Sequence, residues 1–119
     1  MAVPILKQGP FLIATIQAAL TDTDVLQLQD DVMTQVTRHR SRGIIVDVTA
    51  LDVMDSFVSR SLQGIARMTR LRGAETVIVG IQPEVAFAMV QLGMSFEDVQ
   101  TALDLEEGLA LLEAGFLGA

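Results

Sequence analysis

The sequence of 119 residues carries a formal net charge of −7, half of its residues are apolar, and it contains no cysteine. That length suits one domain with its own core, and no second domain is expected. The missing cysteines exclude disulfides and thiol chemistry, and the acidic balance disfavours nucleic-acid binding. No apolar run approaches the ~20 residues that a membrane span needs, and no secretory signal is recognisable, so a cytoplasmic location is the default expectation.

Charge is unevenly distributed along the sequence. Beyond Arg72 there are eight acidic residues and neither Lys nor Arg. The arginines fall in two stretches, at 38–42 and at 60–72, which we interpret mainly as solvated faces of two helices. The asymmetry is compatible with self-assembly, in which basic surface on one chain pairs with acidic surface on another.

The start of the chain predicts a strand hairpin followed by a helix. Val3 to Lys7 and Phe11 to Gln17 are short apolar runs on either side of a Gln-Gly-Pro turn signal, as in an antiparallel hairpin. Residues 21–24 then offer several N-caps, and apolar residues recur at helical spacing until Arg42-Gly43. The recurring residues are Val25, Leu28, Val32 and Val36.

A buried strand and a second helix are expected in the middle of the chain. Gly43 to Thr49 is a nearly continuous β-branched run, which is typical of a strand buried on both faces of a parallel sheet. We expect it to be the central strand. The next helix begins near Asp55 or Ser56 and ends at Gly73, which suits the glycine position that follows a helix.

Two further strand and helix pairs are predicted in the last third of the chain. Thr76 to Gly80 indicates another buried strand. Pro83 favours the first turn of a third helix, where its missing N–H costs nothing, and that helix ends at Gly93. A weaker strand near Val99 to Ala102 and a last helix from Asp104 give the order ββαβαβαβα.

Alternating strands and helices indicate an α/β fold, formed by residues 1–119 as one domain. The expected sheet is mixed and mostly parallel, with an N-terminal antiparallel hairpin and about four helices. Right-handed crossovers place the strands that begin at Gly43, Thr76 and Val99 side by side. Functional groups in such sheets gather at the carboxyl ends of the strands, where we expect the loops Ala50 to Ser56 and Ile81 to Glu84.

Sequence motifs of enzymes are missing: no P-loop, dinucleotide fingerprint, HExxH or GxSxG motif is present. His39, the one histidine, follows Arg38 near a helix end, where a cationic side chain suits the helix dipole. We expect it at the opposite sheet edge from Ser56, too far away for a Ser-His-Asp triad. We therefore expect no enzymatic activity, no metal and no cofactor.

Asp52 and Asp55 are the one carboxylate pair near the expected functional edge. A metal or acid-base role is compatible with such a pair, but capping explains it more simply, with Asp55 as a helix N-cap and Asp52 capping the preceding turn. A two-component receiver domain also places an aspartate after its central strand. It requires further acidic residues after the first strand and a late lysine, whereas this chain has Gln17-Ala18-Ala19 there and no lysine after Lys7. We reject that interpretation.

The stretch from Ile45 to Ser56, IVDVTALDVMDS, resembles the signature of STAS domains, the anti-anti-sigma factor family. Within that family, Asp55-Ser56-Phe57 and the stretch GIQPEVA at 80–86 are similar to RsbS-type stressosome scaffold proteins. So are QLG at 91–93 and TALDLEEGL at 101–109. The resemblance covers nearly the whole chain. With no room for the N-terminal sensor domain of RsbR-type relatives, the minimal scaffold subunit is the better match.

The resemblance implies a STAS fold and a non-enzymatic role in a bacterial stress response. It implies co-assembly with other copies of the chain and with RsbR-type STAS paralogues into a large shell that captures an RsbT-like switch serine/threonine kinase. It further implies that the kinase phosphorylates Ser56 and is thereby released, and that a serine phosphatase resets the scaffold. Neither nucleic acid nor membrane is an expected partner.

Ser56 is the expected phosphorylation site. If Asp55 caps the helix, the Ser56 hydroxyl lies in the first turn at a loop edge, where a kinase reaches it. Ser59 and Ser61, on the following turn, are alternative acceptors. The candidate partner-binding residues around Ser56 are Asp52, Asp55, Gln82 and Glu84.

Two other functions stay open at this point. The same serine would serve a free anti-anti-sigma factor that binds an anti-sigma factor kinase, and native size separates that function from a shell subunit. An enzyme or small-ligand binder would use the edge that carries Asp52 and Asp55, although nothing in the residues favours it.

Overall fold

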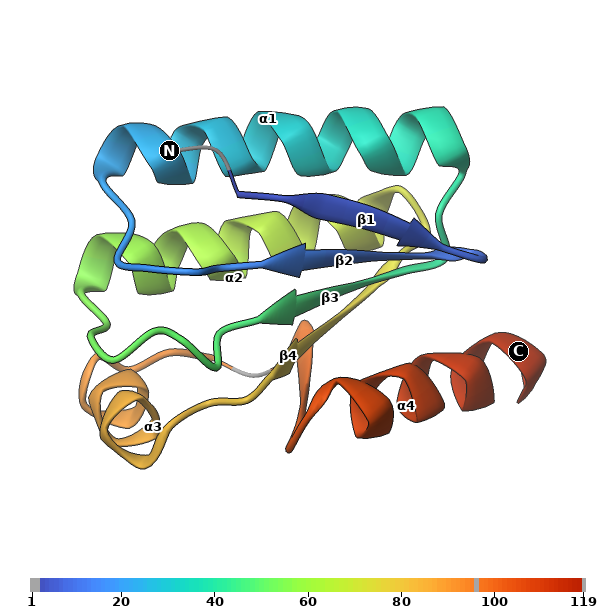
Figure 1. Ribbon diagram of the computed structural model, residues 1–119. Coiled ribbons are helices and arrows are strands. Elements are labelled where there is room, and N and C mark those ends of the chain that lie inside the picture. Colours follow the sequence, from blue (N-terminus) through green and yellow to red (C-terminus); the bar gives the residue numbers. More distant parts are fainter. Residues whose placement is uncertain (1–2, 96, 119) are drawn as a thin grey trace.

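The computed structural model describes residues 3–95 and 97–118, with the side chains of 116–118 excepted. The described chain forms strands and helices in the order that the sequence predicts (Figure 1). The strands are β1 (Ile5–Gln8), β2 (Phe11–Thr15), β3 (Gly43–Asp47), β4 (Glu75–Val79) and β5 (Val99–Ala102). The helices are α1 (Asp22–His39), α2 (Ser56–Leu71), α3 (Pro83–Gln91) and α4 (Leu105–Gly118).

The strands form one mixed sheet in the spatial order β1-β2-β3-β4-β5. β1 pairs antiparallel with β2, and the remaining neighbours pair parallel. This arrangement confirms the predicted hairpin, the central place of the strand that begins at Gly43, and the adjacency of the last three strands. We call the end of the sheet where β2 to β5 finish the carboxyl edge, and the opposite end the amino edge.

Helices cover both faces of the sheet. α1, α2 and α3 contribute to the larger core on one face, and α4 covers the other (Figure 1). Strand β3 contributes to both cores, with Ile44 and Val46 in the larger one and Ile45 in the smaller one. Successive side chains of a strand point to opposite faces, so a strand between two helical layers needs an unbroken apolar run. The residues at 44–46 meet that need.

Several elements end earlier than the sequence pattern predicts. β3 ends at Asp47 and not at Thr49, because the Asp47 side chain bonds to Thr49 and turns the chain. α1 ends at His39 and not at Arg42, because Arg40 adopts a left-handed backbone conformation with φ 49° and ψ 46°. Among the residues that the structure describes, no helix is both long and apolar enough to cross a membrane.

Candidate functional site at the carboxyl edge

Two loops meet at the carboxyl edge of the sheet. Residues 48–55 connect β3 to α2, and residues 80–82 connect β4 to α3. Figure 1 shows the first turns of α2 and α3 on the same side of the molecule, beyond the ends of β2 and β3. This is the edge at which open α/β sheets place their ligands and functional groups.

Asp55 forms the N-cap of α2, as the sequence predicts. Its Oδ1 accepts a hydrogen bond of 2.8 Å from the backbone N–H of Val58, and its backbone carbonyl accepts one of 3.0 Å from Ser59. The cap satisfies a helix N–H that would otherwise lack a partner and fixes where the helix begins. Ser56 is consequently the first residue of α2, and its side chain is exposed.

The three serines at the start of α2 differ sharply in exposure. Ser56 is exposed, whereas Ser59 and Ser61 are only 3% and 8% exposed. The neighbouring Phe57 is half-buried and packs against the larger core. The helix therefore presents the Ser56 hydroxyl to solvent and turns the two later hydroxyls toward the protein interior.

Asp47 organises the turn that precedes this helix. Its Oδ1 accepts hydrogen bonds from the backbone N–H of Thr49, at 3.0 Å, and from the Thr49 hydroxyl, at 2.6 Å. An aspartate bonding two residues ahead is a common turn former, and the Asp-x-Thr spacing is the sequence signal for it. The predicted turn-capping role of Asp52 is therefore wrong: Asp52 is exposed, and its side chain has no hydrogen bond to any described residue.

Gln82 joins the two loops. Its Nε2 donates a hydrogen bond of 2.6 Å to the backbone carbonyl of Thr49. Gly80 lets the loops approach, because its φ is +76° and an added Cβ would overlap the Thr49 side chain. Glu84 lies in the first turn of α3 and is exposed. The structure thus brings Gln82 against the loop that leads to Ser56, while the Glu84 side chain faces solvent.

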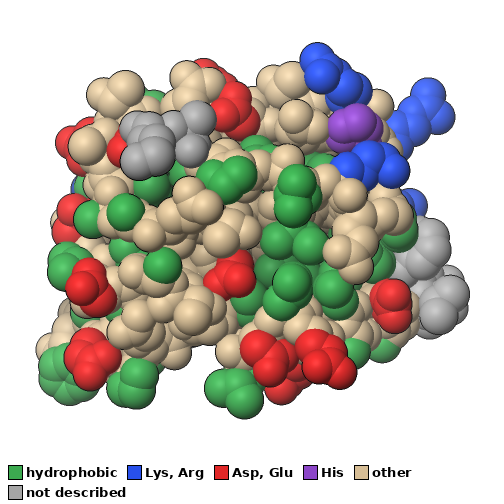
Figure 2. Space-filling model, viewed as in Figure 1, with side chains coloured by type: hydrophobic (Ala, Val, Ile, Leu, Met, Phe, Trp, Pro, Cys, Tyr) green, Lys and Arg blue, Asp and Glu red, His purple; other side chains and the backbone are tan. Residues whose placement is uncertain are grey.

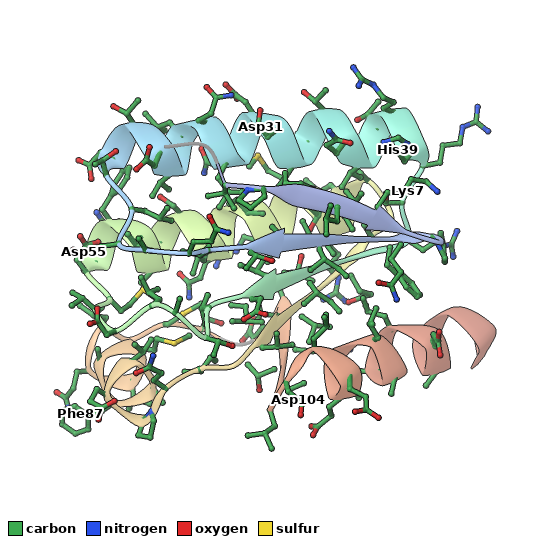
Figure 3. The ribbon with its side chains drawn as sticks, viewed as in Figure 1. Lys7, Asp31, His39, Asp55, Phe87 and Asp104 are labelled. Atoms are coloured by element: carbon green, nitrogen blue, oxygen red, sulfur yellow. The ribbon has the colours of Figure 1, made fainter. Side chains whose placement is uncertain are left out.

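Exposed apolar side chains, which the sequence pattern did not lead us to expect, border the same edge. Val53, in the loop before α2, is 63% exposed, and Phe87 on α3 is 68% exposed. Figure 3 shows Phe87 on the outer side of α3, directed away from the sheet. The exposure of Phe87 could have been predicted from helical spacing. Val85 and Met89 form the buried face of α3, and residue 87 lies on the opposite face. Val53 has no comparable signal in the sequence.

The chemistry that this edge supports is that of an accessible acceptor hydroxyl. His39 lies at the other end of the molecule from Asp55 (Figure 3), so the one histidine of the chain cannot act as a base for Ser56. Among the residues described, no group of three or more acidic or histidine side chains is arranged to bind a metal ion. Asp52 and Asp55, in the loop before Ser56, and Glu84, in the first turn of α3, are exposed and give the carboxyl edge an acidic character.

A comparison with protein families matches residues 2–108 to the STAS domain. Among curated relatives, the RsbT co-antagonist protein RsbRA of Bacillus subtilis is 30% identical over 83 residues, which are 70% of this chain and 30% of RsbRA. The chain therefore spans less than a third of the length of that relative.

Two solved structures are similar over almost their whole length. A serine-to-glutamate variant of RsbS from Moorella thermoacetica superposes with a TM-score of 0.86 at 33% identity, covering 97% of each chain. A chain of the stressosome, a signal integration and transduction hub, has a TM-score of 0.80 at 32% identity. The match covers 95% of this chain and 98% of that chain.

Proposed function

Since this chain belongs to the STAS domain family, we propose that it is a non-enzymatic stressosome scaffold whose affinity for a switch kinase is set by phosphorylation of Ser56. In the unmodified state the carboxyl edge binds an RsbT-like serine/threonine kinase. The kinase phosphorylates Ser56 and dissociates, and a serine phosphatase restores the binding state.

One observation carries the proposal: α2 presents a single exposed hydroxyl, that of Ser56, in its first turn, while Ser59 and Ser61 are buried. A kinase must enclose its acceptor hydroxyl, which only an exposed side chain permits. Asp55 fixes the first turn through its bond to Val58, so the backbone that carries the Ser56 hydroxyl has a defined position relative to the loop. The RsbS and stressosome chains share this fold at 32–33% identity, which supports the same role here.

Phosphorylation of Ser56 is expected to change the local charge strongly while changing the free energy of unfolding only slightly. A phosphoserine adds roughly −1.5 to −2 charge at neutral pH. The helix N-terminus stabilises an anion by only ~0.3–1 kcal/mol, and the nearby Asp52 and Asp55 carboxylates oppose that gain. The fold therefore survives modification, while the surface around Ser56 becomes strongly anionic.

The exposed Val53 and Phe87 explain how the phosphate charge on Ser56 would release a bound partner. Docking on such side chains removes water from the surface around them. A phosphate enclosed in that interface loses its hydration, which is costly unless a cation or several donors replace the water. A partner that binds the unmodified edge through apolar contacts and through Gln82 or Glu84 is therefore expelled.

The expected partners are a switch kinase, RsbR-type STAS paralogues and other copies of this chain. The curated relative RsbRA is named as a co-antagonist of RsbT, which supports a shared assembly with an RsbR-type subunit. Sedimentation of the chain mixed with such a paralogue tests this part. A large co-assembly supports the scaffold, whereas a small complex with an anti-sigma factor supports a free anti-anti-sigma factor.

Kinase capture by substituted chains tests the switch. The chain is immobilised as wild type, Ser56→Ala and Ser56→Glu, and binding of the switch kinase from the same organism is measured. We expect Ser56→Ala to retain binding and Ser56→Glu to lose at least about tenfold in affinity. Thr34→Glu, an equal charge change at an exposed position on α1, is the control and retains binding. Equal binding by Ser56→Glu and wild type would overturn the proposal.

A further inference from the structure

Arginines from three places in the sequence line one hollow at the amino edge of the sheet. The hollow has a volume of about 180 Å³ and lies where α1 and α2 end. Arg40 comes from the end of α1, Arg42 from the connection to β3, and Arg72 from the end of α2. Figure 2 shows Lys and Arg side chains gathered around His39 at this end of the molecule. We call the hollow lined by Arg40, Arg42 and Arg72 the arginine hollow.

Arg40 occupies a backbone conformation that disfavours arginine. Its φ of 49° and ψ of 46° are left-handed, and among the described residues it is the one non-glycine with positive φ. Glycine is the usual residue at this position after a helix. The helix dipole does not require Arg40, because Arg38 and His39 already place basic groups in the last turn. An arginine kept in a strained conformation points to a role for its side chain.

The charge balance of the arginine hollow favours an anion. Arg40 and Arg72 bring a charge of +2, while the ends of α1 and α2 contribute roughly −0.5 each, which leaves a balance of about +1 before Arg42 is counted. No carboxylate is among the described residues that line the hollow. Glu75 lines the neighbouring hollow, which shares Arg42 and Gly73, so it offsets Arg42 more than Arg40 or Arg72. This local excess occurs in a chain with a net charge of −7.

We propose that the arginine hollow binds a small phosphate-bearing anion. Guanidinium groups match phosphate oxygens with paired, charge-assisted hydrogen bonds. Thr37 and the nearly buried Ser41 also line the hollow and bring hydroxyl groups that donate to the same oxygens. Sites for drug-sized ligands are about 300–1,000 Å³, so a volume of about 180 Å³ suits inorganic phosphate or pyrophosphate, or the phosphate end of a larger metabolite.

This site is independent of the proposed kinase switch. The arginine hollow lies at the amino edge, whereas Ser56 lies at the carboxyl edge, at the opposite end of α2. Anion binding at the hollow requires neither a kinase nor an assembled shell. The isolated chain is therefore sufficient for the test, and failure of one proposal leaves the other standing.

Titration of the chain with pyrophosphate tests the site, with amide chemical shifts as the readout in about 0.1 M NaCl. We expect saturable shifts centred on Arg40, Ser41 and Gly73 and a dissociation constant below about 1 mM. Inorganic phosphate, with less charge, is expected to bind more weakly at the same amides. A free metabolite is distinguished from a bare anion by repeating the titration with a nucleoside diphosphate, which shifts additional residues when the larger part also contacts the protein.

Arg40→Gly is the decisive variant because glycine suits the backbone at this position. It removes the guanidinium group without straining the chain, so any loss of binding is not caused by unfolding. We expect at least a tenfold loss of pyrophosphate affinity with Arg40→Gly and with Arg72→Gln. Each variant removes a guanidinium group that would donate charge-assisted hydrogen bonds to the phosphate oxygens. Arg60→Gln, at an exposed arginine of α2 outside the hollow, keeps wild-type affinity. Absence of saturable binding, or undiminished affinity of Arg40→Gly, would overturn the proposal.

Discussion

The side-chain amide of Gln82 donates a hydrogen bond of 2.6 Å to the backbone carbonyl of Thr49, across 33 residues of sequence. Thr49 in turn donates its hydroxyl and its backbone N–H to the Asp47 carboxylate. The chain of contacts from Asp47 through Thr49 to Gln82 fixes the loop that leads to Ser56 against the loop that begins α3. The carboxyl edge is therefore a single braced surface.

Removal of the Gln82 amide is expected to loosen this surface. Gln82→Ala leaves the Thr49 carbonyl without its protein donor, and we expect the free energy of unfolding to fall by ~0.5–1.5 kcal/mol. We also expect faster amide exchange around residues 49–52 in Gln82→Ala, because the hydrogen bond from Gln82 to Thr49 holds that loop. Urea unfolding and hydrogen exchange provide the measurements. Gln91→Ala is the control, because Gln91 is exposed at the other end of α3. It should have little effect on the free energy of unfolding or on amide exchange.

A methyl group at Gly80 is expected to separate the two loops. Gly80→Ala forces a side chain into positive φ and into overlap with Thr49, and we expect a loss of ~2–4 kcal/mol in the free energy of unfolding. Gly93→Ala is the matched control, since Gly93 has a similar φ of +72° and no atom within 4 Å of its added Cβ. It is expected to cost ~1–2 kcal/mol. Equal losses in the two variants, measured by denaturant unfolding, would show that contact with Thr49 is unimportant.

The two aspartates near Ser56 are expected to differ in their contribution to stability. Asp55→Ala removes the N-cap of α2 and should lower the free energy of unfolding by ~0.5–2 kcal/mol. Asp52→Ala should change it by less than ~0.5 kcal/mol, because the Asp52 side chain is exposed and has no hydrogen bond to the described residues. Thermal or urea unfolding of both variants checks this order. The reverse order would mean that Asp52, not Asp55, holds the start of the helix.

Glycine at position 40 is expected to stabilise the chain. Arg40→Gly relieves the left-handed backbone, so the free energy of unfolding should rise by up to ~1 kcal/mol. Arg38→Gly, two residues earlier in the last helical turn, should lower it by up to ~1 kcal/mol because glycine disfavours the helical conformation. Both variants replace an arginine by glycine and remove one positive charge. If the free energy of unfolding, measured in urea, rises in Arg40→Gly and falls in Arg38→Gly, backbone strain and not loss of charge explains the effect at residue 40. A loss of stability in both variants would show that Arg40 is needed for folding.

The start of α2 is predictable from the sequence because its causes are local. Asp55 stands directly before the apolar repeat, and an N-cap bonds only three residues ahead. The central place of β3 is predictable for a similar reason, since the β-branched run at 44–46 requires cover on both faces. These features depend on composition and on short-range spacing.

The hydrogen bond between Gln82 and Thr49 and the arginine hollow are not predictable from the sequence, because each depends on residues that only the fold brings together. Gln82 and Thr49 meet because β3 and β4 pair in parallel with Asp47 opposite Val79. Arg40 and Arg72 meet because α1 and α2 end at the same edge. The sequence pattern predicts for Asp52 the turn-capping role that Asp47 performs, since both are aspartates near the turn and only the structure shows which carboxylate bonds to Thr49.

Mapping the phosphate on the chain after incubation with its switch kinase and ATP tests the central claim most directly. The exposed first-turn hydroxyl predicts that mass spectrometry finds phosphate on Ser56 and on neither Ser59 nor Ser61, which are buried, and that Ser56→Ala is not labelled. Undiminished labelling of Ser56→Ala, or phosphate on Ser59 or Ser61 in the folded wild-type chain, would contradict the account.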